Sequence, residues 1–192
     1  MFCSTAIDQL VCKVVFYGQN VQCESFTTYG LPYVSVARGA SCKIGKGFNM
    51  NNNMASNPIG ITQPCILFVD KDAQLTIGDN VGISQTALVC HISITIGNNV
   101  KIGGGVSIYD TDFHPLDANS RIDPKLDKKN QVKRPVLIHD NAFIGAHTTI
   151  LKGVTIGKNS IIGACSVVTK DVPEDQIWAG NPARMLKTII KE

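Results

Sequence analysis

One histidine of this 192-residue chain lies where a catalytic base could act. His114 is followed by Pro115 inside a polar stretch, YDTDFHPLDANSRIDPKLDKKNQVKRP, which spans residues 109–135. An imidazole with an unperturbed pKa of about 6.5 can take a proton from a hydroxyl group at neutral pH, and a proline restrains the backbone next to it. Position alone fits a solvated loop residue equally well, so the elements around His114 must decide its role.

The chain that follows this stretch repeats every six residues. One position of the repeat is aliphatic, and the position four residues later is small or β-branched. The aliphatic series is Ile138, Ile144, Ile150, Ile156, Ile162 and Val168, and the second series is Ala142, Thr148, Val154, Ser160, Ser166 and Val172. Because residues two apart in a strand face the same side, both series point inward and the other residues turn a corner. The pattern predicts an all-β solenoid, a parallel β-helix built from hexapeptides.

The same register is present before the polar stretch. A repetitive segment at 36–50 recurs at 69–83, and the register continues to Ile108 with one added residue near Ile94. The polar sequence between these segments, NMNNNMASNPIGITQPC, is expected to bulge from the coil. Glycines that follow the inward isoleucines are expected to provide the backbone angles of tight corners. Asparagines at 80, 98, 99, 141 and 159 are expected to tolerate left-handed corner conformations.

Three regions follow from this pattern. Residues 1–33 show no hexapeptide register and are expected to form strands or a cap, since solenoids need atypical ends. Residues 34–173 are expected to form the β-helix, interrupted by the charged loop at 109–135. Residues 174–192 leave the coil through a turn, and for the final MLKTIIKE a short amphipathic helix is favoured over a terminal strand.

Composition excludes few functions. A formal charge of +3 does not favour nucleic acid as a partner. The N-terminus has neither a clean signal-peptide core nor a membrane span. Seven scattered cysteines without a C-x-x-C pair favour a reduced compartment, so the protein is expected to be cytoplasmic.

The repeat [LIV]-[GA]-x-x-[STAV]-x, the loop sequence DTDFHPLD and the ending VVTKDVP…AGNPAR together resemble the hexapeptide-repeat acyltransferases. Within that family the sequence is most similar to the galactoside, maltose and nodulation-factor O-acetyltransferases and to polysaccharide-modifying relatives, over roughly residues 66–188. The resemblance implies a left-handed coil, a homotrimer, and acetyl-coenzyme A (acetyl-CoA) as co-substrate in a groove between subunits. It also implies a sugar-like hydroxyl acceptor and no resident metal.

The resemblance assigns His114 as the general base for acetyl transfer. Two acceptor-pocket positions of the family, an Asn and an Asp, are occupied here by Ser84 and His91. Ser84 still offers a hydroxyl, whereas His91 replaces a carboxylate, so it either binds an acidic or hydroxylated sugar or packs at a corner. Phe143 occupies a position where close relatives carry Trp, which keeps an aromatic wall near the reacting centre.

The carboxylates that flank His114 have open roles. One of Asp110, Asp112 and Asp117 could orient the imidazole or bind acceptor hydroxyls, although loop carboxylates are usually solvated. Arg121 could anchor the loop or contact the substrate.

Donor binding is expected on the last coils. Amide groups of a flat coil face can meet the amides of the pantetheine arm where side chains are small. Corners need small residues in any case, so the small residues alone do not prove a site. By resemblance, Thr169 and Lys170 contact coenzyme A, and cations near its nucleotide end would pair with phosphate. The remaining residues assigned to coenzyme binding are Ala146, Gly163, Ala164, Arg184 and Lys187.

Two other functions stay open at this point. A metal-dependent hydratase on the same coil, like the carbonic-anhydrase-like relatives, needs three convergent imidazoles. The four histidines, at 91, 114, 139 and 147, form no H-x-x-x-x-H pair and fall at different repeat positions. A non-catalytic assembly module is the other alternative, but it would not need the charged interruption with its His-Pro pair.

Overall fold

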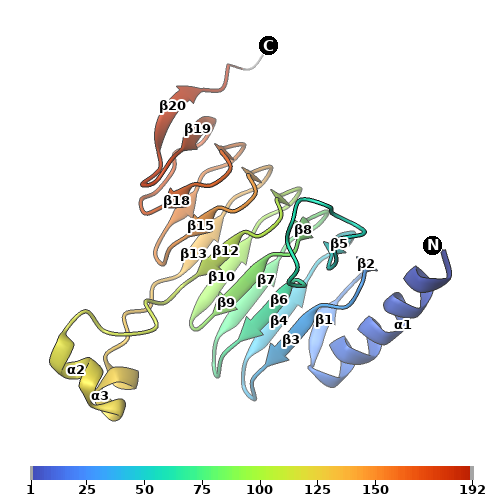
Figure 1. Ribbon diagram of the computed structural model, residues 1–192, viewed down its shortest axis with the longest axis horizontal. Coiled ribbons are helices and arrows are strands. Elements are labelled where there is room, and N and C mark those ends of the chain that lie inside the picture. Colours follow the sequence, from blue (N-terminus) through green and yellow to red (C-terminus); the bar gives the residue numbers. More distant parts are fainter. Residues whose placement is uncertain (1, 191–192) are drawn as a thin grey trace.

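A computed structural model describes residues 2–190 of the chain. Three parallel sheets run along one axis and share their order of strands, so each turn of the chain adds one strand to each sheet (Figure 1). This architecture is a parallel β-helix, as the six-residue period predicts. None of the described helices is long and apolar enough to span a membrane.

The three sheets are named A, B and C here. Sheet A contains β1 (Val21–Cys23), β4 (Ser41–Ile44), β7 (Gln74–Ile77), β10 (Ser93–Ile96), β13 (Val136–Ile138) and β16 (Thr155–Ile156). Sheet B contains β2 (Phe26–Tyr29), β5 (Phe48–Asn51), β8 (Gly82–Ser84), β11 (Lys101–Ile102), β14 (Phe143–Ile144), β17 (Ile161–Ile162), β19 (Gln176–Ala179) and β20 (Arg184–Thr188). Sheet C contains β3 (Tyr33–Val36), β6 (Ile66–Val69), β9 (Ala87–Cys90), β12 (Ser107–Tyr109), β15 (Thr149–Ile150) and β18 (Val167–Val168).

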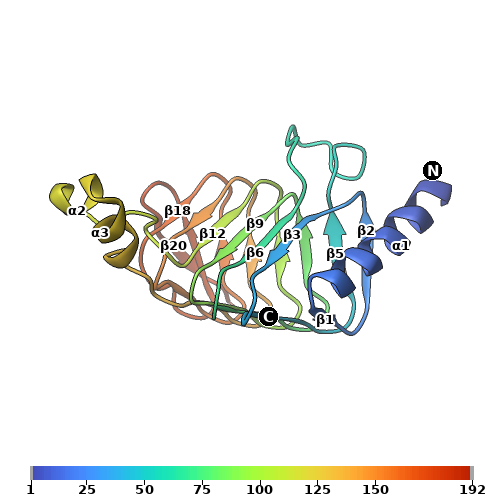
Figure 2. The same cartoon turned by 90° about the horizontal axis from the view of Figure 1, so that it is seen from below.

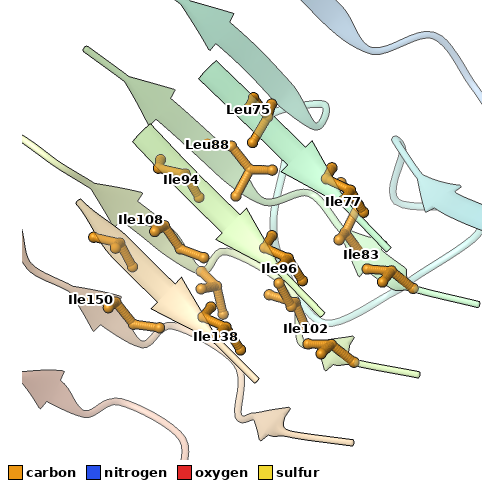
Figure 3. Packing of buried hydrophobic residues seen from close by; sticks show 14 of the residues in the cluster. Leu75, Ile77, Ile83, Leu88, Ile94, Ile96, Ile102, Ile108, Ile138 and Ile150 are labelled. Atoms are coloured by element: carbon orange, nitrogen blue, oxygen red, sulfur yellow. The ribbon is translucent and has the colours of Figure 1, made fainter. Parts of the chain in front are cut away.

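The core is the interior of the coil. The predicted aliphatic positions, from Ile138 to Val168, are buried and stack in register from one turn to the next. Figure 3 shows isoleucine and leucine side chains from the strands pointing toward one another in this interior. Each fully buried aliphatic side chain contributes roughly 1.5–3 kcal/mol relative to an exposed one, so the narrow coil is stabilised mainly by its many stacked aliphatic side chains.

A row of asparagines runs along the corner between sheets A and B. Asn80, Asn99, Asn141 and Asn159 all have positive φ angles, between 57° and 62°, as expected for these corners. Each side-chain amide donates to the side-chain oxygen of the next turn, over 3.3, 3.2 and 2.9 Å, and Asn159 donates to Asp175 over 2.7 Å. Asn98 lacks the positive φ expected of it; its side-chain oxygen accepts from the backbone N–H of Asp79 instead.

The glycines after the inward isoleucines have a different role from the expected one. None of them has a positive φ angle among the described residues. They are needed because the next turn of the coil comes too close for a side chain. A Cβ atom on Gly103 would lie 2.6 Å from the backbone nitrogen of Ala146, and one on Gly145 would lie 2.5 Å from that of Ala164.

The N-terminal residues form helix α1 (Phe2–Gly18), which lies across the first turn of the coil (Figure 2). Cys12 and Phe16 are buried against the coil. The side-chain amide of Gln9 donates to the Phe26 carbonyl and accepts from the Thr28 N–H, so it pairs with the free edge of β2 as a neighbouring strand would. Parallel pairing already begins with β1 against β4, ahead of residue 34.

The predicted C-terminal helix is wrong. Residues 184–188 form strand β20, which pairs antiparallel with β19 and closes the C-terminal end of sheet B. The open edge of β19 offers backbone hydrogen bonds to whatever chain follows it, and this tertiary pairing outweighs the weak helical pattern of so short a segment.

Two segments project from the coil. The first, named the flap here, is residues 53–63 between β5 and β6, and it stands out near the N-terminal end in Figure 2. The second, named the arm, is residues 110–135 and contains α2 (Ala118–Ile122) and α3 (Pro124–Lys129). Figure 1 shows the arm extending away from the coil between β12 and β13.

Candidate active site

His114 lies at the base of the arm and contacts a carboxylate from its second helix. Its Nδ1 atom is 3.0 Å from both side-chain oxygens of Asp127 in α3. The His114 side chain is 65% exposed, whereas that of Asp127 is 21% exposed. With Nδ1 facing the carboxylate, the proton of a neutral imidazole lies on Nδ1, and Nε2 is the atom able to accept a proton.

The backbone around His114 is fixed by local hydrogen bonds. The N–H of His114 donates to the Asp112 carbonyl over 2.7 Å, and the side chain of Gln131 donates to the Phe113 carbonyl over 2.6 Å. Phe113 has a φ angle of 63°, an uncommon conformation for a bulky residue. Arg121 donates to the carbonyls of Pro115 and Leu116, over 2.8 and 2.7 Å. These two hydrogen bonds tie the Arg121 side chain to the backbone of the loop, and its contact with substrate stays a prediction.

None of the three carboxylates predicted to orient His114 does so in the structure. Asp110 is fully buried and accepts from the backbone N–H groups that follow β9, at residues 91, 92 and 93. Asp112 forms an ion pair with Lys152 at 2.7 Å. Asp117 caps α2, and hydrogen bonds from the Ser120 side chain and backbone N–H hold the pKa of Asp117 below its usual value.

The sequence does not predict Asp127 as the partner of His114, because nothing in it places Asp127 next to the histidine. Asp127 lies 13 residues from His114, within a stretch that has no apolar periodicity. The Asp-Pro pair at 123–124 is a helix-start signal that could have indicated α3, but a six-residue helix alone does not tell which of its side chains meets the histidine.

His91 is packed rather than open. Its ring lies between Phe68 and Phe113, with centroid distances of 5.5 and 5.7 Å, and its side chain is 15% exposed. Its Nδ1 is 3.1 Å from a side-chain oxygen of Asp70, a distance that fits an ion pair, although the geometry is not that of a hydrogen bond. Of the two predicted roles, packing at a corner is the one that this geometry favours. Through Phe113, His91 supports the residue just before His114.

Ser84 and Phe143 lie on the outer face of sheet B. They line one groove of about 500 Å³, together with Asn49, Asn51 and Lys101. The Ser84 hydroxyl accepts a hydrogen bond from the Asn51 side chain over 3.0 Å. His114 instead follows β12, at the corner where sheet C leads to sheet A. Within a single chain, His114 and the groove at Ser84 and Phe143 therefore lie on different sides of the coil.

The small residues predicted to contact coenzyme A form a column at the corner between sheets B and C. Ala146 and Ala164 follow β14 and β17, and their backbone atoms pack against Gly103 and Gly145 of the preceding turns. A Cβ atom on Gly163 would lie 2.8 Å from the Cβ of Ala179. Close stacking of turns alone accounts for these glycines.

The predicted cations are exposed at the C-terminal end of the coil. Thr169 and Lys170 follow β18, at the same type of corner as His114. Arg184 and Lys187 lie on β20, whose residues are all exposed. These four residues are therefore divided between two places, the corner after sheet C and the terminal hairpin of sheet B.

No group of three or more His, Cys, Asp or Glu side chains within the described residues is arranged to hold a metal ion. The exposed His139 and His147 lie on different corners from His114, after β13 and β14.

Comparisons with known proteins show which proteins this chain resembles. Residues 135–170 match the model of the bacterial transferase hexapeptide, six repeats. The chain is 34% identical over 129 residues to the galactoside O-acetyltransferase of Escherichia coli, an alignment that covers 64% of this chain and 61% of that protein. It is 41% identical over 103 residues to the galactoside O-acetyltransferase of Lactococcus lactis, covering 53% and 46%. The structure of a maltose O-acetyltransferase from Clostridium difficile aligns with a TM-score of 0.56 at 25% identity, over 97% of this chain and 89% of that one.

These matches confirm the resemblance drawn from the sequence: the chain is similar to the hexapeptide-repeat acyltransferases and carries the transferase hexapeptide over residues 135–170. The three parallel sheets and the Clostridium structure also fit a left-handed β-helix. The chain spans less than two thirds of the length of the two galactoside relatives.

Proposed function

We propose that this protein transfers an acetyl group from acetyl-CoA to a hydroxyl of a sugar or polysaccharide precursor, with His114 as general base. The observation that carries this proposal is the Nδ1 contact of His114 with Asp127, at 3.0 Å, on an otherwise exposed imidazole. This arrangement fixes the tautomer and leaves Nε2 to take the hydroxyl proton.

The reaction follows from this arrangement. Nε2 of His114 takes the proton of the acceptor hydroxyl as its oxygen attacks the thioester carbonyl. The carbon–sulfur bond then breaks, the electron pair goes to sulfur, and the imidazolium returns its proton to the thiolate. The products are the acetyl ester and free coenzyme A. Asp127 stabilises the imidazolium between these steps and holds the ring in place.

Donor binding is proposed along the C-terminal turns. The flat column that includes Ala146, Gly163 and Ala164 would receive the pantetheine arm, with backbone amides as hydrogen-bond partners. Thr169 and Lys170 lie at the next corner of the coil, on the other side of sheet C from this column. Arg184 and Lys187 on β20 would pair with the phosphates, the arginine through its planar fork.

A second copy of the chain would complete the site. His114 and the groove at Ser84 and Phe143 lie on different sides of one coil, so one molecule alone does not bring them together. A homotrimer, as the family resemblance implies, would place the His114 corner of one copy against sheet B of the next. We propose this trimer as the active form, acting in the cytoplasm.

The acceptor and the donor are tested together. Purified protein is incubated with acetyl-CoA and a panel of sugars, amino sugars and serine, and thiol release is measured. The proposal predicts turnover with at least one sugar hydroxyl and a rise in melting temperature with coenzyme A, because a ligand bound only to the native state stabilises it. An unchanged melting temperature with both coenzyme A and acetyl-CoA would indicate a non-catalytic coil. Zinc bound to the purified protein, found by metal analysis, would favour the hydratase-like alternative.

A further inference from the structure

Two hollows on the outer face of sheet B share Asn51. The first is the groove at Ser84 and Phe143 described above. The second has a volume of about 230 Å³ and lies at the N-terminal end, between α1, the end of β2 and the flap. Its walls include Asp8 of α1, Tyr29 of β2, and Asn53 and Ser56 of the flap.

The two hollows are connected in register along the sheet. Tyr29 pairs with Asn51, and Asn51 pairs with Ser84, so the three residues lie on successive strands and face the same side. Neighbouring strands are about 4.8 Å apart, which puts about 10 Å between the Tyr29 and Ser84 backbones. This span exceeds one hexose ring. A ligand that reacts near Ser84 and reaches Tyr29 must therefore contain more than one sugar unit.

The side chains of the second hollow suit a neutral sugar. Amide and hydroxyl groups of Asn51, Asn53 and Ser56 can both donate and accept hydrogen bonds. The Tyr29 ring is 40% exposed and offers an apolar face for the C–H groups of a sugar. The described residues that line this hollow include no lysine or arginine, so its chemistry does not favour a phosphate group.

The walls are held in place before any ligand arrives. Asp8 accepts from the Gly30 N–H over 2.9 Å, which fixes α1 against the end of β2. Buried Asn52, at one end of the flap, donates to the Thr28 hydroxyl and accepts from the Cys65 N–H, each over 2.9 Å. Buried Gln85 donates to the Ile61 carbonyl over 2.5 Å and secures the other end.

The direction along the coil separates donor from acceptor. The residues proposed to contact coenzyme A, such as Ala146 and Lys170, lie on turns that are C-terminal to Ser84. The second hollow lies on turns that are N-terminal to it. An acceptor chain that extends from the reacting hydroxyl toward Tyr29 therefore runs away from the donor and does not compete with it.

We propose that the hollow at Tyr29 is a subsite for a non-reacting unit of an oligosaccharide acceptor, and that the natural acceptor is a glycan chain rather than a free monosaccharide. This inference rests on the proposed acetyl transfer. It assigns a binding role to α1 and the flap, which that transfer alone does not require.

The test compares chain lengths in homologous series. Acetyl transfer is measured with glucose and maltotetraose, galactose and β-1,4-galactotetraose, and N-acetylglucosamine and chitotetraose. The expected result is a tetrasaccharide kcat/KM at least about tenfold above that of its monosaccharide in one series. Tyr29→Ala should raise the tetrasaccharide KM by about tenfold and leave the monosaccharide unchanged.

Matched variants make the result specific. Tyr33→Ala removes an exposed tyrosine of sheet C and should change neither acceptor. Tyr29→Phe keeps the ring and should retain the chain-length preference, which separates stacking from loss of fold. Equal kcat/KM for both lengths in every series, or an equal loss for both lengths in Tyr29→Ala, would overturn the subsite and leave acetyl transfer standing. Absence of transfer to all six acceptors would overturn the proposed function and the subsite together.

Discussion

Asp127 of α3 places both of its carboxylate oxygens 3.0 Å from Nδ1 of His114, and the two residues come from opposite parts of the arm. The short helices α2 and α3 are capped by Asp117 and Asp123, whose side chains accept from backbone N–H groups. Both partners of this contact therefore belong to the arm.

Asp127→Asn should lower kcat by about a hundredfold and change the KM for acetyl-CoA little. The amide cannot stabilise the imidazolium and can favour the wrong tautomer, while donor binding lies elsewhere. The pH dependence of kcat should also change. In a His114→Ala background the same substitution should cost nothing further. An additional loss in that background would show that Asp127 acts independently of the histidine. Asp72→Asn, at an exposed corner, is the matched control.

Lys170→Ala and Arg184→Ala should each raise the KM for acetyl-CoA, by about tenfold, with little change in kcat. Each removes a cation proposed to contact coenzyme A, and a hydrogen bond to a charged group is worth about 1.5–3 kcal/mol. Lys71→Ala is the control, because Lys71 follows β6 at the same type of corner on an N-terminal turn. Unchanged Michaelis constants in both variants would remove these two residues from the donor site.

Coenzyme A should protect Cys165 from alkylation. Cys165 is exposed and directly follows Ala164. Burial raises the pKa of the other described thiols, which keeps them protonated at neutral pH; the values are about 12 for Cys12, Cys42, Cys65 and Cys90 and about 11 for Cys23.

Iodoacetamide labelling, followed by mass spectrometry of each peptide, should therefore modify Cys165 first among the six cysteines whose side chains the structure describes, and saturating coenzyme A should slow that modification several-fold. The Cys165→Ser variant shows how much of the total iodoacetamide labelling comes from Cys165. Labelling at the same rate with and without coenzyme A would place the donor away from this corner.

Gly145→Ala should destabilise the fold by about 1–3 kcal/mol, because a Cβ atom there would lie 2.5 Å from the backbone nitrogen of Ala164. Urea unfolding measures the change. Gly18→Ala is the control, since nothing lies within 4 Å of a Cβ at that position. A Gly145→Ala protein as stable as wild type would mean that the turns can separate without cost.

The sequence predicts the coil well because its constraint is local and repeated. Every turn from Ile138 to Val168 buries the same type of side chain, so the period of six is sufficient to identify inward positions. The ends and the arm lack this repetition. The final segment, 184–188, pairs with β19 because a free sheet edge is available there, which composition alone does not reveal. The glycines after the inward isoleucines lie at corners, as predicted. They are needed there because the adjacent turn comes close, and not because of unusual backbone angles.

From the sequence, His114 could be selected as the candidate base, whereas the residues around it could not be placed. The His-Pro pair and its break in register mark His114. The contact with Asp127 depends on how α2 and α3 fold together, and the separation of Ser84 from His114 depends on which sheet each strand joins. Neither property is encoded in nearby residues.

The most direct test of the account is the rate of acetyl transfer by His114→Ala, measured as kcat/KM for the best acceptor of the panel. Loss of a positioned general base should lower this rate by about 10²–10⁴-fold, with an unchanged melting temperature because the side chain is exposed. His139→Ala, which removes another exposed histidine, should retain wild-type activity. A His114→Ala enzyme within about tenfold of wild type would contradict the assignment of His114 as the base.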